Sequence, residues 1–286
     1  MKVMITLIQR NLKLFFKDKT VVLFSLLSTL IVLGLYILFL GRVTFSEMAD
    51  FPGINILIGS WVMSGILAIL PVNSSLGSLS TMLVDKEKGT YEDLIMTPLS
   101  RLQIIGGYVL STFLVTLILS SITLLATEVY LASLGEALLS LGDLVDLLFK
   151  IILNTLIATL LLFCVSLFFK NLNAYSLFNS ILGTVIGFLT GTLIPIGELS
   201  SVFQKIIMVF PFSHSAAMFR KILMEGSLKT VFAGADSVTV QNFRQTMGID
   251  FIINGKPLTD LESILYLLLW GVLGLLISLV RLKQKS

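Results

Sequence analysis

Long uncharged stretches, separated by short polar and charged segments, dominate the pattern of the 286-residue chain. A helix needs about 20 mostly apolar residues to cross the hydrocarbon core of a bilayer. Six stretches come close to that length or exceed it, and Lys150, at the edge of the fourth, is the one Asp, Glu, Lys, Arg or His residue within their bounds. They predict six transmembrane helices, over residues 21–41, 53–84, 102–127, 147–169, 172–194 and 263–280.

The second stretch is longer than a bilayer requires. Its later half, residues 73–81, is rich in Ser and also contains Thr and Asn. Small polar residues suit close helix packing better than contact with lipid. We therefore expect this half to continue into the cytoplasm as a protein-buried extension of the span, with a kink at Pro71.

The first 19 residues predict an amphipathic helix that lies in the membrane interface. Its apolar stripe consists of Ile5, Ile8, Leu12 and Phe15. The opposite, polar face carries Lys2, Thr6, Gln9, Arg10, Lys13 and Lys17, and its lysines are expected to point toward anionic headgroups. The alternative interpretation is a positively charged flank that only sets the orientation of the first span.

Composition and charge distribution narrow the class of protein. Hydrophobic residues make up 56% of the chain and charged residues 13%, whereas globular proteins contain about 25% charged residues. Lipid must therefore be the solvent for most of the chain. Twelve of the 20 Lys and Arg residues flank one side of the predicted spans, which places both termini in the cytoplasm. No dense basic block exists for nucleic acid, so that partner is excluded.

A charged segment, residues 85–101, separates the second and third predicted spans and holds seven charged side chains. Gly89 permits a sharp turn, Thr90 is expected to cap a short helix with Asp93 three residues later, and Pro98 ends it. A short, stiff helix beneath the membrane is suited to docking a cytoplasmic partner. The alternative is an ordinary charged loop between spans.

Two capping boxes are predicted at the starts of spans. Ser100 with Gln103 opens the third span, and Thr259 with Glu262 opens the sixth. In such a box the two side chains satisfy backbone donors that the first helical turn leaves without partners. These pairs fix where the two helices begin.

The outer segment, residues 195–262, contains short amphipathic helices interrupted at Pro195 and Pro211. Broken helices at membrane depth are tolerated where protein buries them or water lines them. Asn254-Gly255 predicts a tight turn near the end of this segment.

The counts of reactive residues exclude several chemistries. Cys164 and His214 are the only residues of their types, so disulfide frameworks, zinc clusters and two-histidine catalysis are absent. The chain contains no Gly-x-x-x-x-Gly-Lys-Ser/Thr phosphate loop, so it cannot hydrolyse ATP in the usual way. His214, beside a proline at an interface, is expected to be packed or solvated.

The charged segment also carries a family resemblance. Asp85-Lys-Glu-Lys-Gly-Thr-Tyr-Glu-Asp-Leu, followed by Thr97-Pro98 and Arg101, resembles the acidic, glycine-containing loop of ABC type-2 permeases. These are the membrane subunits of many bacterial ABC exporters. The family usually has Glu where this chain has Asp85, and often a neutral residue where it has Asp93. Length, six spans, the amphipathic N-terminal helix and an aromatic-proline segment before the last span extend the resemblance over the whole chain.

The resemblance implies an all-α integral membrane protein with a single permease domain over residues 1–286 in the bacterial inner membrane. Two such chains, identical or homologous, would pair with two cytoplasmic ATPase subunits that hold ATP and Mg. This chain itself would bind no cofactor or metal and would not be an enzyme. Residues 85–101 would be the coupling loop, and its expected docking residues are Asp85, Lys86, Glu87, Lys88, Gly89, Thr90, Glu92, Asp93, Leu94, Thr97, Pro98 and Arg101.

In the family, the outer segment forms short helices that dip back into the outer leaflet and close the pathway. The resemblance therefore implies an outer gate at Pro195, Phe210, Pro211 and Phe212.

We expect the chain to export an amphipathic or hydrophobic cargo, such as a drug, an antimicrobial peptide or a lipid-like molecule. A secondary carrier or channel is the alternative, although the span cores lack the ionisable groups that ion-coupled carriers generally use. An intramembrane enzyme is disfavoured because the one histidine lies outside every predicted span. The identity of the cargo, the pairing as homodimer or heterodimer, the lining of the path and the role of His214 stay open.

Overall fold

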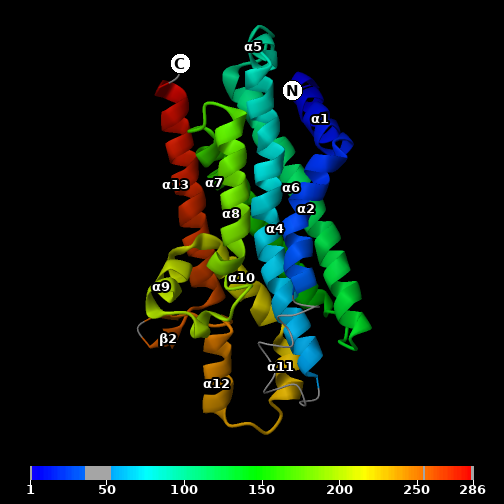
Figure 1. Ribbon diagram of the computed structural model, residues 1–286, viewed down its shortest axis with the longest axis vertical. Helices are drawn as coiled ribbons and strands as arrows, with labels where there is room; N and C mark the ends of the chain where they lie inside the picture. Colours follow the sequence, from blue (N-terminus) through cyan, green and yellow to red (C-terminus); the bar gives the residue numbers. More distant parts are fainter. Residues whose placement is uncertain (1, 36–52, 254, 285–286) are drawn as a thin grey trace.

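Long, roughly parallel helices form the body of the protein in the computed structural model, which describes residues 2–35, 53–253 and 255–284 (Figure 1). Predictions that fall on residues 36–52, including the end of the first span, and on Asn254 lie outside the described residues. Both ends of the described chain lie at the same end of the bundle.

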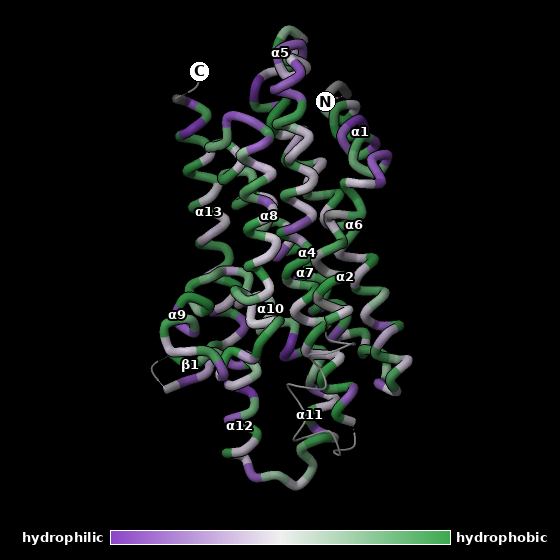
Figure 2. The backbone as a smooth tube through the Cα atoms, in the orientation of Figure 1, coloured by the Kyte–Doolittle hydropathy of each residue, from purple (hydrophilic) through white to green (hydrophobic). Residues whose placement is uncertain are grey.

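Five helices of the described chain are long and apolar enough to cross a membrane. They are α4 (Ile54–Glu87), α6 (Arg101–Ser133), α7 (Leu141–Ser166), α8 (Leu172–Leu189) and α13 (Asp260–Gln284). A further helix, α2 (Lys19–Leu35), overlaps the first predicted span. Figure 2 shows that hydrophobic residues predominate along the middle of these helices and that hydrophilic residues are more frequent at the ends of the bundle. The predicted all-α integral membrane fold is confirmed.

Helix α4 runs through the middle of the bundle and packs against α2, α6, α7 and α8. Its serines bond to neighbouring helices: the Ser75 and Thr116 hydroxyls are 3.2 Å apart, and those of Ser78 and Thr112 are 3.0 Å apart. The polar stretch therefore faces protein, as its composition predicts. The helix continues through Pro71 without a break, and a kink there stays a prediction.

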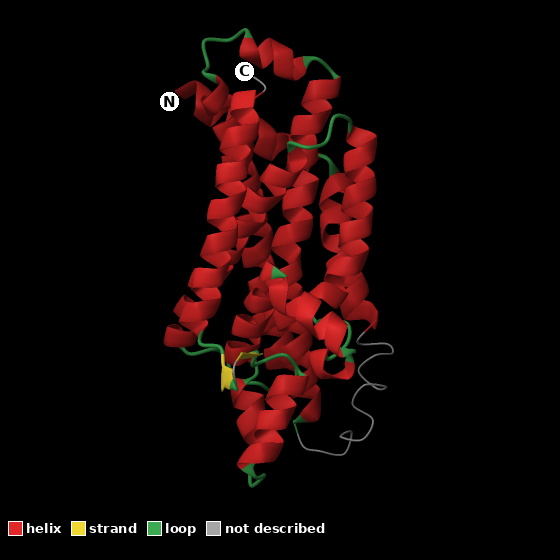
Figure 3. Cartoon of the chain, turned by 90° about the vertical axis from the view of Figure 1, so that its left-hand side faces the viewer, coloured by secondary structure: helices red, strands yellow, loops and turns green. Residues whose placement is uncertain are grey.

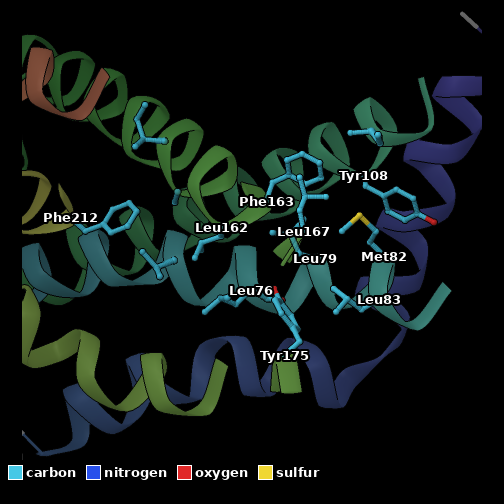
Figure 4. Packing of buried hydrophobic residues seen from close by; sticks show 14 of the residues in the cluster. Leu76, Leu79, Met82, Leu83, Tyr108, Leu162, Phe163, Leu167, Tyr175 and Phe212 are labelled. Atoms are coloured by element: carbon cyan, nitrogen blue, oxygen red, sulfur yellow. The ribbon is translucent and has the colours of Figure 1, made fainter. Parts of the chain in front are cut away.

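The largest apolar core surrounds the second half of α4, residues 69–83. Leu76, Leu79 and Met82 meet Leu162 and Phe163 of α7 (Figure 4). On another side of α4, the buried Tyr175 of α8 donates a hydrogen bond from its hydroxyl to the Leu76 carbonyl, 2.8 Å away. These contacts fix α7 and α8 relative to α4.

The amphipathic N-terminal helix is α1 (Lys2–Lys17), which packs against α6. Its buried residues are Leu7, Asn11 and Phe15, whereas Ile5 is 45% exposed. Phe15 of the predicted apolar stripe therefore packs against protein, and the protein-packed face is rotated away from Ile5. The physical reason lies on α6, where Gly107 leaves room for Leu7 and Ser111 accepts a 3.2 Å hydrogen bond from the Asn11 amide. Contact of the stripe with the membrane interface stays a prediction.

At the end of the bundle opposite the termini, short elements form a cap (Figure 1). In chain order they are η3 (Ile196–Glu198), α9 (Ser201–Val209), α10 (Pro211–Leu223), α11 (Glu225–Val231), α12 (Ser237–Thr246), β1 (Ile252–Ile253) and β2 (Lys256–Pro257). Helices α9 and α10 are bent by 89° at Phe210, as expected for a helix interrupted by Pro211. Helix α12 has no counterpart among the predictions.

Local signals correctly mark several boundaries. The capping box of Ser100 and Gln103 is present at the start of α6. The Thr259 hydroxyl accepts from the Glu262 backbone N–H at 3.3 Å, and the Glu262 carboxylate accepts from the Thr259 backbone N–H at 2.8 Å. Gly255 adopts a φ of 75° in the turn between β1 and β2.

Candidate docking helix, groove and outer cap

Helix α5 (Thr90–Ile95) lies across the end of the bundle between α4 and α6 (Figure 3). Gly89 is its N-cap and has a φ of 77°, a left-handed conformation that a residue without a Cβ adopts readily. Thr90 is the first helical residue and makes no capping bond, so the predicted cap at Thr90 is wrong. Glycine at this position makes the turn by backbone freedom instead of by a side-chain cap.

The end of α5 also differs from the prediction, which extended the helix to Thr97. The helix ends at Ile95 with Met96 as its C-cap. The Thr97 hydroxyl donates to the Leu94 carbonyl at 2.6 Å, and this local bond closes the last turn before Pro98.

The two sides of α5 have different surroundings. Tyr91 and Leu94 pack against the main core, and the Tyr91 ring stacks on Tyr108 of α6 with a centroid distance of 6.4 Å. Burial raises the pKa of the Tyr91 hydroxyl. The opposite side exposes Glu92, Asp93 and the 89% exposed Met96. Helix α5 is thus fixed on one side and presents an acidic, partly apolar surface on the other.

The predicted docking residues divide into three groups by exposure. The exposed members are Glu87, Lys88, Glu92, Asp93, Pro98 and Arg101. The half-buried members are Lys86, Gly89, Thr90, Leu94 and Thr97. Asp85 alone is buried. Met96, which the sequence reasoning missed, is exposed beside this group. The available signal was a large apolar residue in a charged segment between two spans.

The Asp85 carboxylate is the centre of a buried polar cluster. Arg10 of α1 donates two hydrogen bonds to it, 2.6 and 2.7 Å long, and the Tyr108 hydroxyl donates a third of 2.5 Å. Its side chain is 5% exposed. Hydrogen bonding to Asp85 raises the pKa of the Arg10 guanidinium. Arg10, on the predicted polar face of α1, is therefore bound by a carboxylate of α4.

Glu87, two residues further along α4, bonds to α8. Its Oε1 accepts a 2.7 Å hydrogen bond from the Leu172 backbone N–H, at the first residue of that helix. Asn171 caps the same helix by accepting from the Ala174 N–H at 2.9 Å. A carboxylate at a helix N-terminus is also favoured by the helix dipole.

A groove of about 880 Å³ lies between α2 and α8, with α4 as its floor. Asn73, Gly77 and Ser80 lie on the floor, and hydroxyls from α8 and apolar side chains from α2 line the walls. Within the part of the chain that the structure describes, none of the lining residues is ionisable. The surface is therefore neutral, with hydrogen-bonding groups set among apolar ones.

Arg220 of α10 is a fully buried cation that the sequence reasoning missed. Its guanidinium donates to the carbonyls of Thr190, Gly191 and Gly248 at 3.2, 2.8 and 3.1 Å. The guanidinium carbon also lies 5.2 Å from the centroid of the Trp61 ring of α4. One side chain therefore joins the end of α8, the turn after α12, and α4.

A chain of ion pairs links the cap of short elements, at the end of the bundle opposite the termini, to α7 and α13. Lys150 of α7, whose side chain is 3% exposed, pairs with Asp146 at 2.8 Å and with Asp260 of α13 at 2.5 Å. Lys221 of α10 pairs with Asp260 at 3.0 Å and with Asp250 at 3.9 Å. Lys150 therefore lies near the start of its span, as the sequence predicts, and carboxylates at the starts of two spans compensate its charge.

Three of the four predicted gate residues, Phe210, Pro211 and Phe212, lie at the bend between α9 and α10, and Pro195 precedes η3. Pro195, Pro211 and Phe212 are buried, Phe210 is half-buried, and the two phenylalanine rings meet edge to face at 5.4 Å. This packing closes the bend but assigns no gating role to it.

His214 lies near the same bend and is packed. Its Nε2 is 2.8 Å from the Met208 carbonyl, and its ring lies 4.4 Å from the Tyr266 ring centroid. The sequence predicts that His214 is either packed or solvated, and in the structure it is packed.

Apolar spanning helices that enclose a neutral groove, with a short polar helix at one end, define a multi-pass membrane protein suited to transport. A family model described as ABC-2 family transporter protein matches residues 52–280. The chain therefore belongs to the ABC-2 transporter family and is a transport subunit that is not itself catalytic. No curated protein matches it in sequence.

Proposed function

We propose that the chain is the permease subunit of an ATP-driven exporter of the bacterial inner membrane, with both termini in the cytoplasm. Two cytoplasmic ATPase subunits supply the energy, and a second permease chain, identical or homologous, completes the membrane part. The cargo is amphipathic or hydrophobic and moves outward.

The observation that carries this proposal is the two-sided packing of α5. Tyr91 and Leu94 hold the helix rigidly on the bundle, while Glu92, Asp93 and Met96 stay exposed at its surface. Exposed acids around a large apolar side chain suit a partner with a pocket and a basic rim. Because α5 leads directly into α6 and follows α4, a partner that moves it also moves two central helices.

The groove supports the cargo part of the proposal. Its walls offer hydroxyls such as Ser180 and Thr184 together with apolar side chains such as Ile31 and Phe188. Such a surface can bind a neutral amphipathic molecule at membrane depth, because polar groups of the cargo find partners that lipid does not offer. A strongly ionic cargo would lose its hydration without compensation.

Reversing one charge on α5 tests the docking surface. Glu92→Lys places a cation on the exposed acidic side and is expected to weaken ATPase capture about tenfold, or roughly 1.4 kcal/mol. The measurement is the amount of ATPase subunit that copurifies with the tagged chain in mild detergent, when both are expressed from their own neighbouring genes.

The matched control is Glu198→Lys, which reverses an exposed acid of the outer cap and should leave capture unchanged. Equal capture by both variants would remove the docking role of α5. A wild-type chain that retains no ATPase subunit would favour the secondary carrier or channel.

Filling the groove tests the cargo route. A Cβ added at Gly183 would lie 3.7 Å from Asn73 Oδ1, an ordinary contact, so Gly183→Leu should fold. Its side chain is expected to reduce ATP-driven transport about tenfold while ATPase capture stays normal. Transport into inside-out vesicles measures the first quantity, and Gly34→Leu on α2, where a Cβ meets no atom within 4 Å, is the control. Normal transport by Gly183→Leu would place the route elsewhere.

A further inference from the structure

The last turn of α4 carries two acids: one is bonded to α1, the helix that precedes the α2 wall of the groove, and the other is bonded to the α8 wall. Asp85 binds Arg10 of α1, which leads into α2, and Glu87 binds the first residue of α8. We propose that Asp85 and Glu87 are positioning residues that transmit movement of the docking helix α5 to the α2 and α8 walls of the groove. This inference rests on the proposed function of α5 and assigns the two acids a role inside the chain instead of contact with the ATPase.

The Asp85 connection leads to α2 through a short joint. Asp18 alone separates α1 from α2, and its Oδ1 accepts from the backbone N–H groups of Thr20 and Val21 at 3.0 and 3.1 Å. Backbone bonds also cross the joint, from the Asp18 N–H to the Leu14 carbonyl and from the Val22 N–H to the Asp18 carbonyl. A displacement of α1 is therefore passed to the base of α2, where Thr20 and Val21 already line the groove.

The same cluster reaches α5 on its other side. Tyr108 donates to Asp85 and stacks on Tyr91 of α5. The Lys86 ammonium, between the two acids in sequence, lies 5.4 Å from the Tyr91 ring centroid. Tyr91 therefore contacts Tyr108, which binds Asp85, and Lys86, which follows Asp85 in the chain. These contacts couple a shift of α5 to the polar cluster around Asp85.

The Glu87 connection is shorter and weaker. A single 2.7 Å hydrogen bond joins an exposed carboxylate to the Leu172 N–H, whereas Asp85 is buried and holds a two-point bond to a guanidinium. Charge-assisted, bidentate bonds are the stronger and more directional kind. We therefore expect the α2 wall to follow α5 closely and the α8 wall to follow it more loosely.

The first experiment tests the α1 connection without any ATPase. Spin labels are placed on exposed positions of α1 and α5 by Lys13→Cys and Met96→Cys, after Cys164→Ala removes the only native cysteine. In nanodiscs the parent should give one narrow label-to-label distance, which Asp85→Asn broadens. Asp93→Asn neutralises an exposed acid on α5 and should not change it. An unchanged distribution in Asp85→Asn would overturn the connection.

The second experiment tests transmission in the complex with the copurified ATPase. Labels on Ile31 of α2 and on Ser180 of α8 are each paired with a label on Leu269 of α13, which is exposed on another side of the bundle. ATP should shift both distances in the parent. Asp85→Asn should lose the α2 shift and keep the α8 shift, and Glu87→Gln should do the reverse.

Rescue and a second variant separate transmission from a general structural role. Asp85→Glu keeps the carboxylate and should restore the α2 shift, and Arg10→Gln, at a half-exposed position, should repeat the Asp85→Asn result. Parent-like shifts of both walls in Asp85→Asn and Arg10→Gln, with normal ATPase capture, would overturn transmission alone. Failure of the parent to capture an ATPase would instead overturn the proposed function, while the first experiment still decides whether the cluster holds α1 to α5.

Discussion

Gly89→Pro is expected to cause a large loss of ATP-driven transport while the membrane bundle stays folded. Gly89 has a φ of 77°, whereas the proline ring fixes φ near −65°. The chain must therefore leave α4 in a different direction, and α5 loses its contact through Tyr91 and Leu94. We expect transport to fall more than about tenfold, which corresponds to roughly 1.4 kcal/mol or more of lost docking free energy.

The measurement compares transport into inside-out vesicles with the thermal unfolding of the purified subunit. Gly89→Asn is the matched control, because asparagine tolerates the left-handed conformation and a Cβ at this position meets no atom within 4 Å. Its transport should stay close to that of the parent. Transport by Gly89→Pro at the level of Gly89→Asn would show that the direction of α5 does not matter.

Arg220→Leu is expected to cause the largest loss of stability. The substitution leaves the carbonyls of Thr190, Gly191 and Gly248 without their shared guanidinium donor in a fully buried site. Hydrogen bonds to charged groups contribute about 1.5–3 kcal/mol each, and buried acceptors left unsatisfied add to the loss, so we expect at least about 3 kcal/mol. A lower unfolding temperature in detergent measures this effect.

The neighbouring cation provides the control. Lys221→Met removes the same charge one residue later, but Lys221 is half-buried and its carboxylate partners are more exposed than the surroundings of Arg220. A partly exposed ion pair contributes about 1 kcal/mol or less. Equal unfolding temperatures for the two variants would contradict the role of Arg220 as the central bond of the outer cap.

Sequence patterns predicted the parts of this protein that depend on neighbouring residues in the chain. The spans follow from uncharged length, and the capping boxes at Ser100 and Thr259 follow from residues three positions apart. Gly89 was correctly expected to turn the chain. The cap was assigned to Thr90 because threonine followed by an acid three residues later is a typical capping sequence, but the backbone begins the helix one residue earlier, at Gly89.

The missed features depend on pairing between distant parts of the chain. Arg10 and Asp85 are 75 residues apart, and Lys150 and Asp260 are 110 residues apart. A hydropathy pattern records that a charge is present but not which carboxylate compensates it. Arg220 was missed for a related reason: its acceptors are backbone carbonyls, which no residue type reveals.

The burial of α4 has a consequence for how the protein is made. Ser75 and Ser78 bond to hydroxyls of α6 that follow 41 and 34 residues later in the chain. During synthesis α4 therefore leaves the ribosome before these partners exist, and Ser75 and Ser78 lack their interhelical bonds until α6 enters the membrane. We expect α4 and α6 to pack together early in membrane assembly. A nascent chain stopped between them would expose a serine-rich helix to cellular quality control.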